Sequence, residues 1–171
     1  MKNKLVSVVA LAALAGVASA QLTGFKVSAG YGFSGGITDS GGVSRTMSGP
    51  ELMATMPFQH LPLIDIGLEA DILFGGGFGN SSIKGDVYRF LLTGRATIPG
   101  SQVGAWLGMG WGTAQGSSGD FASINGYVTQ VGISIPLGMH TPVLSPTLDV
   151  AGDMGSKPGL SGFSVSVGLR F

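Results

Sequence analysis

Residues 162–171, Gly-Phe-Ser-Val-Ser-Val-Gly-Leu-Arg-Phe, alternate strictly between large apolar side chains and small or polar ones. The apolar side chains stand at the odd positions, which are Phe163, Val165, Val167, Leu169 and Phe171. A β-strand points successive side chains to opposite faces, so this stretch predicts a strand with one apolar and one polar face. We expect it to be the last strand of the fold.

Residues 1–20 have the pattern of a secretory signal peptide. Lys2 and Lys4 make a basic start, residues 5–17 are an apolar run, and Ala18-Ser19-Ala20 matches the A-x-A cleavage pattern. The apolar run is shorter than the roughly 20 residues that a membrane-spanning helix needs. We therefore expect cleavage after Ala20 and a mature chain, residues 21–171, that folds as one domain.

The composition excludes several classes of function. Without Lys2 and Lys4, seven basic residues face nine acidic ones, and this balance gives no sign of a nucleic-acid partner. The chain has no cysteine, which excludes disulfides, thiol catalysis and cysteine-ligated metals. Glycine is abundant, with 31 residues, but the regular apolar alternation argues against a disordered chain.

The rest of the mature chain repeats the alternating pattern in eight segments. Their ranges are 22–34, 45–58, 63–74, 86–98, 102–113, 121–135, 143–153 and 161–171. Each is near or above the roughly 9–11 residues with which a tilted strand crosses a bilayer. Connectors rich in Gly, Ser and Asp (35–44, 75–85, 114–120 and 154–160) alternate with connectors marked by proline (59–62, 99–101 and 136–142). We expect the first set outside the cell and the second in the periplasm.

The face on which each residue type falls distinguishes a membrane barrel from a soluble one. With one parity assigned to each strand, twelve of the fourteen aromatic residues fall on the apolar face. Eleven of the sixteen charged residues after residue 20 fall on the opposite face, and the others lie in or beside loops. The aromatic residues form two expected rims: Tyr31, Phe33, Phe74, Tyr88, Trp111, Phe121 and Phe163 at one end, and Phe25, Phe58 and Phe171 at the other. Two aromatic rims around an aliphatic band are typical of outer-membrane barrels.

By this pattern the mature chain resembles the small eight-stranded outer-membrane barrels of the OmpA and OmpX type. Their terminal assembly signal reads polar-x-Gly-x-x-apolar-x-apolar, which Ser164, Leu169 and Phe171 match, although Ser166 stands at the glycine position. The resemblance implies an all-β, antiparallel, up-and-down transmembrane barrel in the bacterial outer membrane. It also implies outer-membrane lipid, the barrel assembly machinery and periplasmic chaperones as partners.

Charged residues on the inward face of the third and fourth strands predict a ladder of ion pairs. A hairpin that places Asp71 opposite Arg89 also places Asp65 opposite Arg95. Buried charges persist when they are paired and hydrogen-bonded, so we expect a structural role for these four residues. The alternative is that Asp65, Glu69 and Asp71 do general acid–base work in an active site.

Histidine gives little support for catalysis or metal binding. His60 and His140 both fall in predicted periplasmic turns, whereas the similar lipid A deacylase barrels use a His–Ser pair near the outer rim. A two-histidine metal site would lack obvious further ligands. We therefore predict no catalytic, cofactor-binding or metal-binding residue.

Two features of the predicted strands have local explanations. Gly108, Gly110 and Gly112 share the inward face with Trp106, and small residues must alternate with large ones inside so narrow a barrel. The alternative for this glycine track is a narrow solute path. Pro50 lacks the N–H that a closed sheet uses, so we expect a bulge there or a strand that starts after it.

The sequence thus predicts a non-enzymatic integral outer-membrane protein with a structural or surface-interaction role, carried by its outside loops. The alternative is a narrow, porin-like pore or carrier for small solutes. A lipid-modifying outer-membrane enzyme is the third hypothesis.

Overall fold

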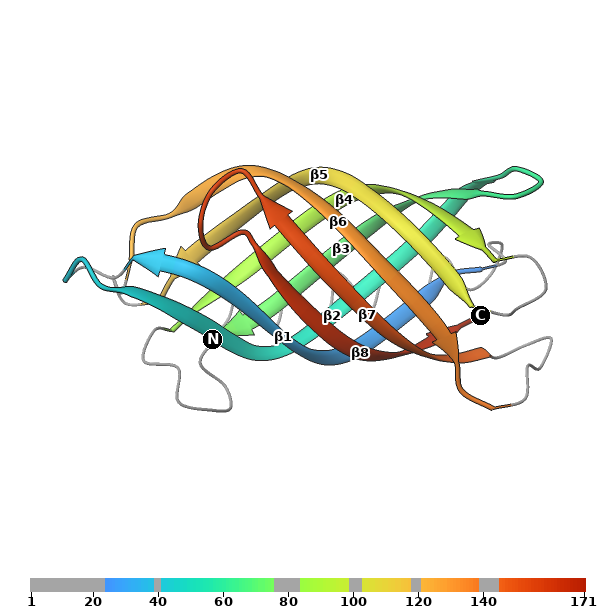
Figure 1. Cartoon of the computed structure of the whole chain (residues 1–171), viewed down its shortest axis with the longest axis horizontal. Coiled ribbons are helices and arrows are strands. Elements are labelled where there is room, and N and C mark those ends of the chain that lie inside the picture. The colour runs from blue at the N-terminus through green and yellow to red at the C-terminus, as the bar shows by residue number, and fades with distance from the viewer. Residues whose placement is uncertain (1–23, 39–40, 76–83, 99–102, 118–120, 139–144) are drawn as a thin grey trace.

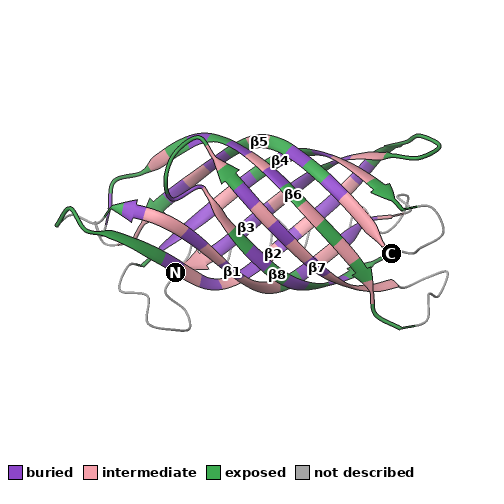
Figure 2. Cartoon of the chain, viewed as in Figure 1, coloured by how far each residue is buried: buried purple, intermediate pink, exposed green. Residues whose placement is uncertain are grey.

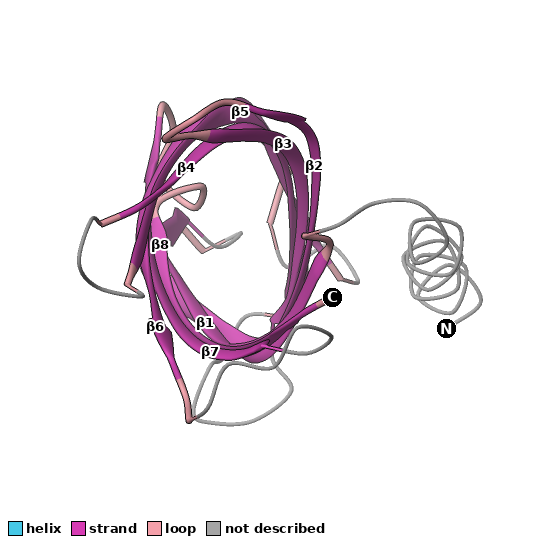
Figure 3. Ribbon diagram, turned by 90° about the vertical axis from the view of Figure 1, so that its right-hand side faces the viewer, coloured by secondary structure: helices cyan, strands magenta, loops and turns pink. Residues whose placement is uncertain are grey.

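Eight antiparallel strands close into a barrel in chain order (Figures 1 and 3). The structure is a computed structural model that describes residues 24–38, 41–75, 84–98, 103–117, 121–138 and 145–171, so the predicted signal peptide lies outside the described residues. The strands are β1 (Lys26–Thr38), β2 (Ser44–His60), β3 (Asp65–Gly75), β4 (Gly85–Thr97), β5 (Gly104–Gly116), β6 (Ile124–Pro136), β7 (Ser145–Gly155) and β8 (Gly162–Arg170). The predicted fold class is confirmed, and strand ends differ from the predicted ones by at most four residues. Across the described ranges, no helix is long and apolar enough to cross a membrane.

Burial alternates along the strands with a period of two, as Figure 2 shows. In β8, Ser164 and Ser166 are 2% and 4% exposed, whereas Val167 is 52% exposed. In this strand the inner face is therefore the polar one, and the outer face carries the large apolar side chains. This arrangement is the reverse of a soluble barrel, whose apolar face points inward.

The outer surface carries a band of exposed apolar side chains drawn from all parts of the sheet. On β3 to β6 and β8 the band includes Leu68, Phe90, Leu92, Leu107, Met109, Trp111, Tyr127, Val131, Ile133, Phe163, Val165, Val167 and Leu169. Aromatic rings pair across strands within it: Phe33 stacks on Phe163 at 4.7 Å between ring centroids, and Trp111 meets Tyr127 edge-on at 5.1 Å. At the terminus end Phe25 lies beside Phe171, with 6.4 Å between the ring centroids, as the predicted rim requires. One member of the other rim differs, because Phe121 packs in the interior cluster.

A bulge in β1 places Ile37 inside the barrel. The pairing of β1 with β2 shifts register between Ser34 and Ile37, and Ile37 is fully buried. One extra residue in a strand moves the following side chains to the opposite face. The expected bulge at Pro50 is absent: Pro50 lies opposite Tyr31 in a continuous β2, and the paired register of β2 with β3 begins one residue later.

The two ends of the barrel differ. The terminus end carries Phe171 and the turns that follow β2, β4 and β6, and the loop end carries the other connections (Figure 1). Buried apolar side chains fill the interior toward the loop end and form what we call the apolar plug. Its members are Ile37, Met47, Leu73, Val87, Leu91, Ala114, Phe121, Val128 and Leu160.

The β7–β8 connection contributes to this plug instead of projecting from the barrel. Leu160 is fully buried, and the Gly159 N–H donates to Gly35 O at 2.6 Å while Gly35 N–H donates to Ser161 O at 3.0 Å. Gly159 has φ +88°, and a Cβ there would lie 2.7 Å from Ile37 Cγ1, so both backbone conformation and space require glycine. This connection was predicted as an outside loop rich in Gly, Ser and Asp; it lies at the loop end, but its last residue, Leu160, is buried in the plug. The apolar plug binds it through Leu160.

We expect Leu160→Ala to destabilise the barrel by about 2–5 kcal/mol, because it removes a fully buried side chain from a closely packed interior. The measurement is the free energy of unfolding in urea for the protein folded in detergent or lipid. Leu63→Ala is the matched control, since Leu63 is 73% exposed in the β2–β3 turn and should change the free energy by less than about 0.5 kcal/mol. An equal decrease in the free energy of unfolding in the two variants would contradict the packing of Leu160 in the plug.

Candidate functional site

Charged side chains occupy the interior between the apolar plug and the terminus end. Among the described residues, those on the inner face below the rim are three basic residues and five acidic ones: Lys26, Arg89, Arg95, Glu51, Glu69, Asp71, Asp149 and Asp153. A charge this far from water needs partners. These residues form a central cluster around Arg89 and two groups nearer the terminus end.

The central cluster joins one guanidinium to three carboxylates. Arg89 Nη1 lies 2.5 Å from Asp71 Oδ2 and 3.1 Å from Glu51 Oε1, and Arg89 Nη2 lies 3.2 Å from Asp153 Oδ2. The four side chains come from β4, β3, β2 and β7, and each is at most 2% exposed. Arg89 thus connects strands that are not neighbours in the barrel. Its single positive charge faces three carboxylates.

The predicted hairpin register is present between β3 and β4. Asp71 lies opposite Arg89, and Asp65 lies opposite Arg95. The structure brings the first pair into contact but not the second: Arg95 Nη2 binds Glu69 Oε2 and donates to Thr55 Oγ1 at 3.1 Å. The predicted Asp65–Arg95 ion pair is therefore wrong, although the register that suggested it is right.

Burial explains the exchange of partners. The Glu69 side chain is fully buried and depends on a cation, whereas the Asp65 side chain at the rim is 28% exposed to water. Arg95 reaches inward to Glu69, and its guanidinium lies over the Trp106 ring at 4.4 Å. Asp65 instead contacts Arg170 Nη2 at 3.0 Å and His60 Nδ1 at 2.8 Å.

Trp106 connects the Arg95 group near the terminus end with the central Arg89 cluster. Its Nε1–H donates to Gln130 Oε1 at 2.7 Å, and Gln130 Nε2 donates to Asp153 Oδ1 at 3.1 Å. The indole lies over Gly132, where an added Cβ would overlap Trp106 Cζ2. Glycine there provides space for the large ring, as alternation of small and large residues requires.

The predicted glycine track on β5 is explained by the same packing. A Cβ on Gly108 would lie 3.1 Å from Thr93 Cγ2, and one on Gly112 would lie 2.7 Å from Val128 Cγ2. A Cβ on Gly110 would overlap Phe90 O, so neighbouring backbone approaches closely there. These contacts favour packing relief over a solute path.

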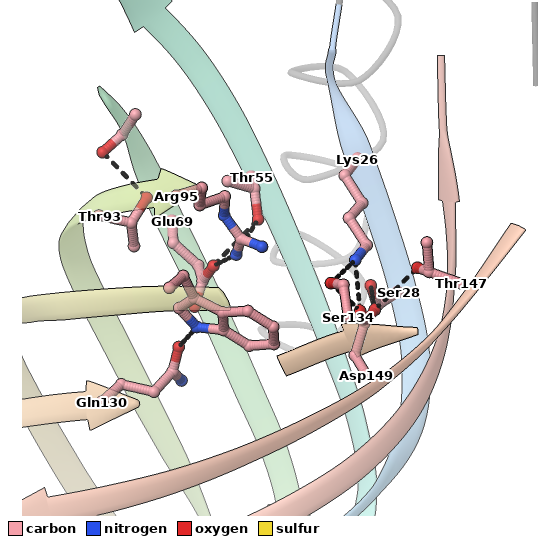
Figure 4. A network of polar contacts seen from close by, with 12 residues as sticks. Lys26, Ser28, Thr55, Glu69, Thr93, Arg95, Gln130, Ser134, Thr147 and Asp149 are labelled. Carbon is pink, nitrogen blue, oxygen red and sulfur yellow. Dashed lines mark hydrogen bonds and ion pairs between the residues drawn. The ribbon is translucent and has the colours of Figure 1, made fainter. Parts of the chain in front are cut away.

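The second group near the terminus end is centred on Asp149 of β7. Its carboxylate accepts hydrogen bonds from Lys26 Nζ at 2.5 Å, Ser134 Oγ at 2.5 Å and Ser28 Oγ at 3.0 Å. Figure 4 shows this group and the group of Arg95, Glu69 and Thr55, each held by its own hydrogen bonds. Each of these contacts joins side chains from different strands, so the interior stabilises closure of the sheet.

Sequence reasoning missed most of these partners, although part of the signal was available. In the β6–β7 hairpin, Gln130 lies opposite Asp153 and Ser134 lies opposite Asp149, which is the same matched spacing that indicated the β3–β4 register. The contacts of Glu51 and Asp153 with Arg89 had no such signal. They form between strands that are not hairpin neighbours of β4.

The other predicted residues lie where their strands place them. Ser164 is buried on the inner face of β8, and Leu169 and Phe171 are exposed on the outside. Their role in assembly stays a prediction. His60 is at the terminus end beside Asp65, and His140 lies outside the described residues. Within the described ranges, no group of three His, Cys, Asp or Glu could hold a metal ion.

Solved structures similar to this chain are small barrels. Neisserial surface protein A has a TM-score of 0.52 at 15% identity, over 85% of this chain and 95% of that one. Ail, the attachment invasion locus protein of Yersinia pestis, has a TM-score of 0.48 at 19% identity, over 88% and 100%. The N-terminal β-barrel domain of Pseudomonas aeruginosa OprF has a TM-score of 0.42 at 11% identity, over 88% and 100%. No protein-family model and no curated protein matches the sequence.

The chain has the fold of the small eight-stranded outer-membrane β-barrels. At these identities the likeness concerns the fold. In this chain, the interior network depends on residues such as Arg89, Glu51 and Asp153 at their particular registers.

We expect Arg89→Gln to lower the free energy of unfolding by about 3–5 kcal/mol, because it leaves three buried carboxylates without their cation. Asp71→Asn should lower the free energy of unfolding by clearly less, because Arg89 keeps two carboxylate partners and the cluster loses one of its excess negative charges. The measurement is urea unfolding in detergent micelles. Arg170→Gln serves as the control, because its ion pair with Asp65 is exposed and such pairs contribute about 0–1 kcal/mol. Equal costs for the Arg89 and Asp71 variants would contradict the shared-cation arrangement.

Proposed function

We propose that this protein is an integral outer-membrane barrel that does not conduct solutes and acts through the surface at its loop end, with a structural or surface-interaction role. The observation that carries the proposal is a sealed interior inside an apolar outer face. The apolar plug fills the interior toward the loop end, and the Arg89 cluster fills the middle.

The outer face supports the membrane location. Its band of exposed aliphatic and aromatic side chains would be costly in water and is suited to hydrocarbon and to its interfaces. The charged side chains of the strands point inward, where ion pairs and hydrogen bonds join them. We propose outer-membrane lipid as the medium around this band, and the barrel assembly machinery and periplasmic chaperones as the partners that deliver the chain there.

The loop end supports a surface role. The described residues at this end include exposed polar side chains beside the buried plug, among them Ser123, Asn125, Ser156 and Lys157. Leu160 holds the β7–β8 loop down, so this loop presents a fixed polar surface. A rigid scaffold that positions polar loops is the usual arrangement for binding at a barrel end.

The pore and enzyme alternatives have weaker support. A narrow porin-like pore would require a continuous polar path, whereas the plug consists of apolar side chains that are at most 6% exposed. A lipid-modifying enzyme of the deacylase kind would need a histidine near the outer rim, and His60 lies at the terminus end.

Planar-bilayer recording tests the sealed interior. We expect the purified protein to insert without producing discrete conductance steps, because apolar side chains and buried ion pairs occupy the lumen. A large water-filled porin, recorded under the same conditions, is the positive control. Reproducible single-channel steps from this protein would favour the pore alternative.

Cysteine labelling in intact cells tests the location and orientation. The chain has no cysteine, so Lys157→Cys at the loop end and Leu63→Cys at the terminus end each introduce a single thiol at an exposed position. A membrane-impermeant maleimide should label the first variant in intact cells and the second only after lysis. Labelling of Leu63→Cys alone in intact cells would reverse the proposed orientation, and labelling of neither would contradict surface exposure.

A further inference from the structure

The interior opens at the terminus end into a cavity of about 290 Å³. Strands from all around the barrel line it, and Trp106 forms part of its wall. The Arg170 and Asp65 side chains at its mouth are 43% and 28% exposed, so solvent reaches them. The proposed surface role at the loop end makes no use of this cavity.

Positive charge dominates the lining of the cavity. Lys26, Arg95 and Arg170 line it, and Asp65 is the carboxylate among the described lining residues. The acids that pair with the two deeper cations, Asp149 and Glu69, are not lining residues and are at most 2% exposed. Each of these ion pairs therefore turns its cation toward the cavity and its carboxylate into the wall. Although each of these cations has a carboxylate partner, the charged groups that a ligand in this cavity would contact are mainly cations.

Hydrogen-bond donors remain available on these cations. Arg95 uses the nitrogen Nη2 for both Glu69 and Thr55, whereas its Nε is buried out of reach of the cavity, so Nη1 is the nitrogen that remains for a ligand. Ser134 and Thr147 line the same cavity, but their hydroxyls already donate to Asp149. The guanidinium and ammonium groups are therefore the donors that would bind the oxygens of a phosphate or carboxylate.

We propose that this cavity is a binding site for a small free oxyanion of the phosphate or carboxylate class. Arg95 and Lys26 are the deep contacts, and Arg170 is the contact at the mouth. The bound anion does not pass through the barrel, because the Arg89 cluster and the apolar plug lie beyond the cavity. The site is a pocket that faces the side of the membrane on which the turns after β2, β4 and β6 lie.

Trp106 provides a direct reporter of occupancy. The chain has two tryptophans, and Trp111 is exposed on the outer face, so Trp111→Phe leaves Trp106, in the wall of the cavity, as the single tryptophan to be excited selectively. The experiment titrates this variant, folded in neutral maltoside detergent, with inorganic phosphate and separately with citrate, at constant ionic strength. We expect a saturable change in Trp106 fluorescence with at least one of the two anions. Sodium chloride and choline chloride should give none.

Variants in the same background locate the response. Arg170→Gln should weaken apparent binding by about tenfold or more, as loss of one charge-assisted contact predicts. The double change Arg95→Gln and Glu69→Gln removes a deep cation and its partner together, so that no buried charge is left unpaired, and it should weaken binding similarly. Lys157→Gln, at the loop end, is the matched control and should leave the titration unchanged.

Three outcomes would overturn the proposal. The first is the absence of any saturable response to phosphate and to citrate in the folded protein. The second is an equal response in Arg170→Gln, in the double variant and in the parent. The third is a response to short-chain dihexanoyl phosphatidate but to neither free anion, which would assign the cavity to a lipid headgroup. Recordings of channel activity and surface labelling are independent of these results, so failure here leaves the proposed function standing.

Discussion

Closure of an eight-stranded sheet is the constraint on which the rest of this structure depends. A closed barrel of this size has an interior barely wide enough for its own side chains, and every second residue of every strand must enter it. Because the apolar residues of this chain take the outer face, the interior receives the polar ones. A narrow interior of polar groups is stable only when those groups satisfy one another. The ion pairs of Arg89, Arg95 and Lys26 are thus a consequence of putting the apolar face outside.

The interior meets this constraint in two different ways along its axis. Toward the loop end the interior side chains are apolar and form the apolar plug. The β1 bulge and the β7–β8 loop contribute Ile37 and Leu160 to it. In the middle, Arg89 joins β2, β3, β4 and β7 through three carboxylates. The plug needs no hydrogen-bond partners and excludes water. Its position next to the Arg89 cluster therefore strengthens the electrostatic interactions there, since a drier surrounding lowers the local dielectric.

Sequence predicted the strands and the inner face well because both follow from alternation, which is a local property. It predicted the Asp71–Arg89 contact because hairpin neighbours share a register that two residues can fix. It failed for Asp65, because a register gives the opposite residue but not the direction in which a long side chain extends. It also failed for Ile37, which was placed in an outside connector and which a bulge in β1 carries into the interior. It failed for Phe121 as well, which lies before the start of β6 and packs inward, where alternation within a strand does not fix the direction of a side chain. Contacts across the lumen depend on closure, and no local pattern encodes them.

The asymmetry of the two ends limits what the barrel can do. At the loop end, apolar side chains seal the interior, and polar residues such as Ser156 and Lys157 face outward. At the terminus end, cations line a cavity that ends against Trp106 and Arg95. An anion that enters this cavity must leave by the same mouth, because ion pairs and the plug occupy the space beyond. The two proposals together therefore describe a barrel that holds a ligand at equilibrium without sustaining a flux. In that description each end of the barrel is a separate binding surface, and the packed interior between them keeps both ends rigid.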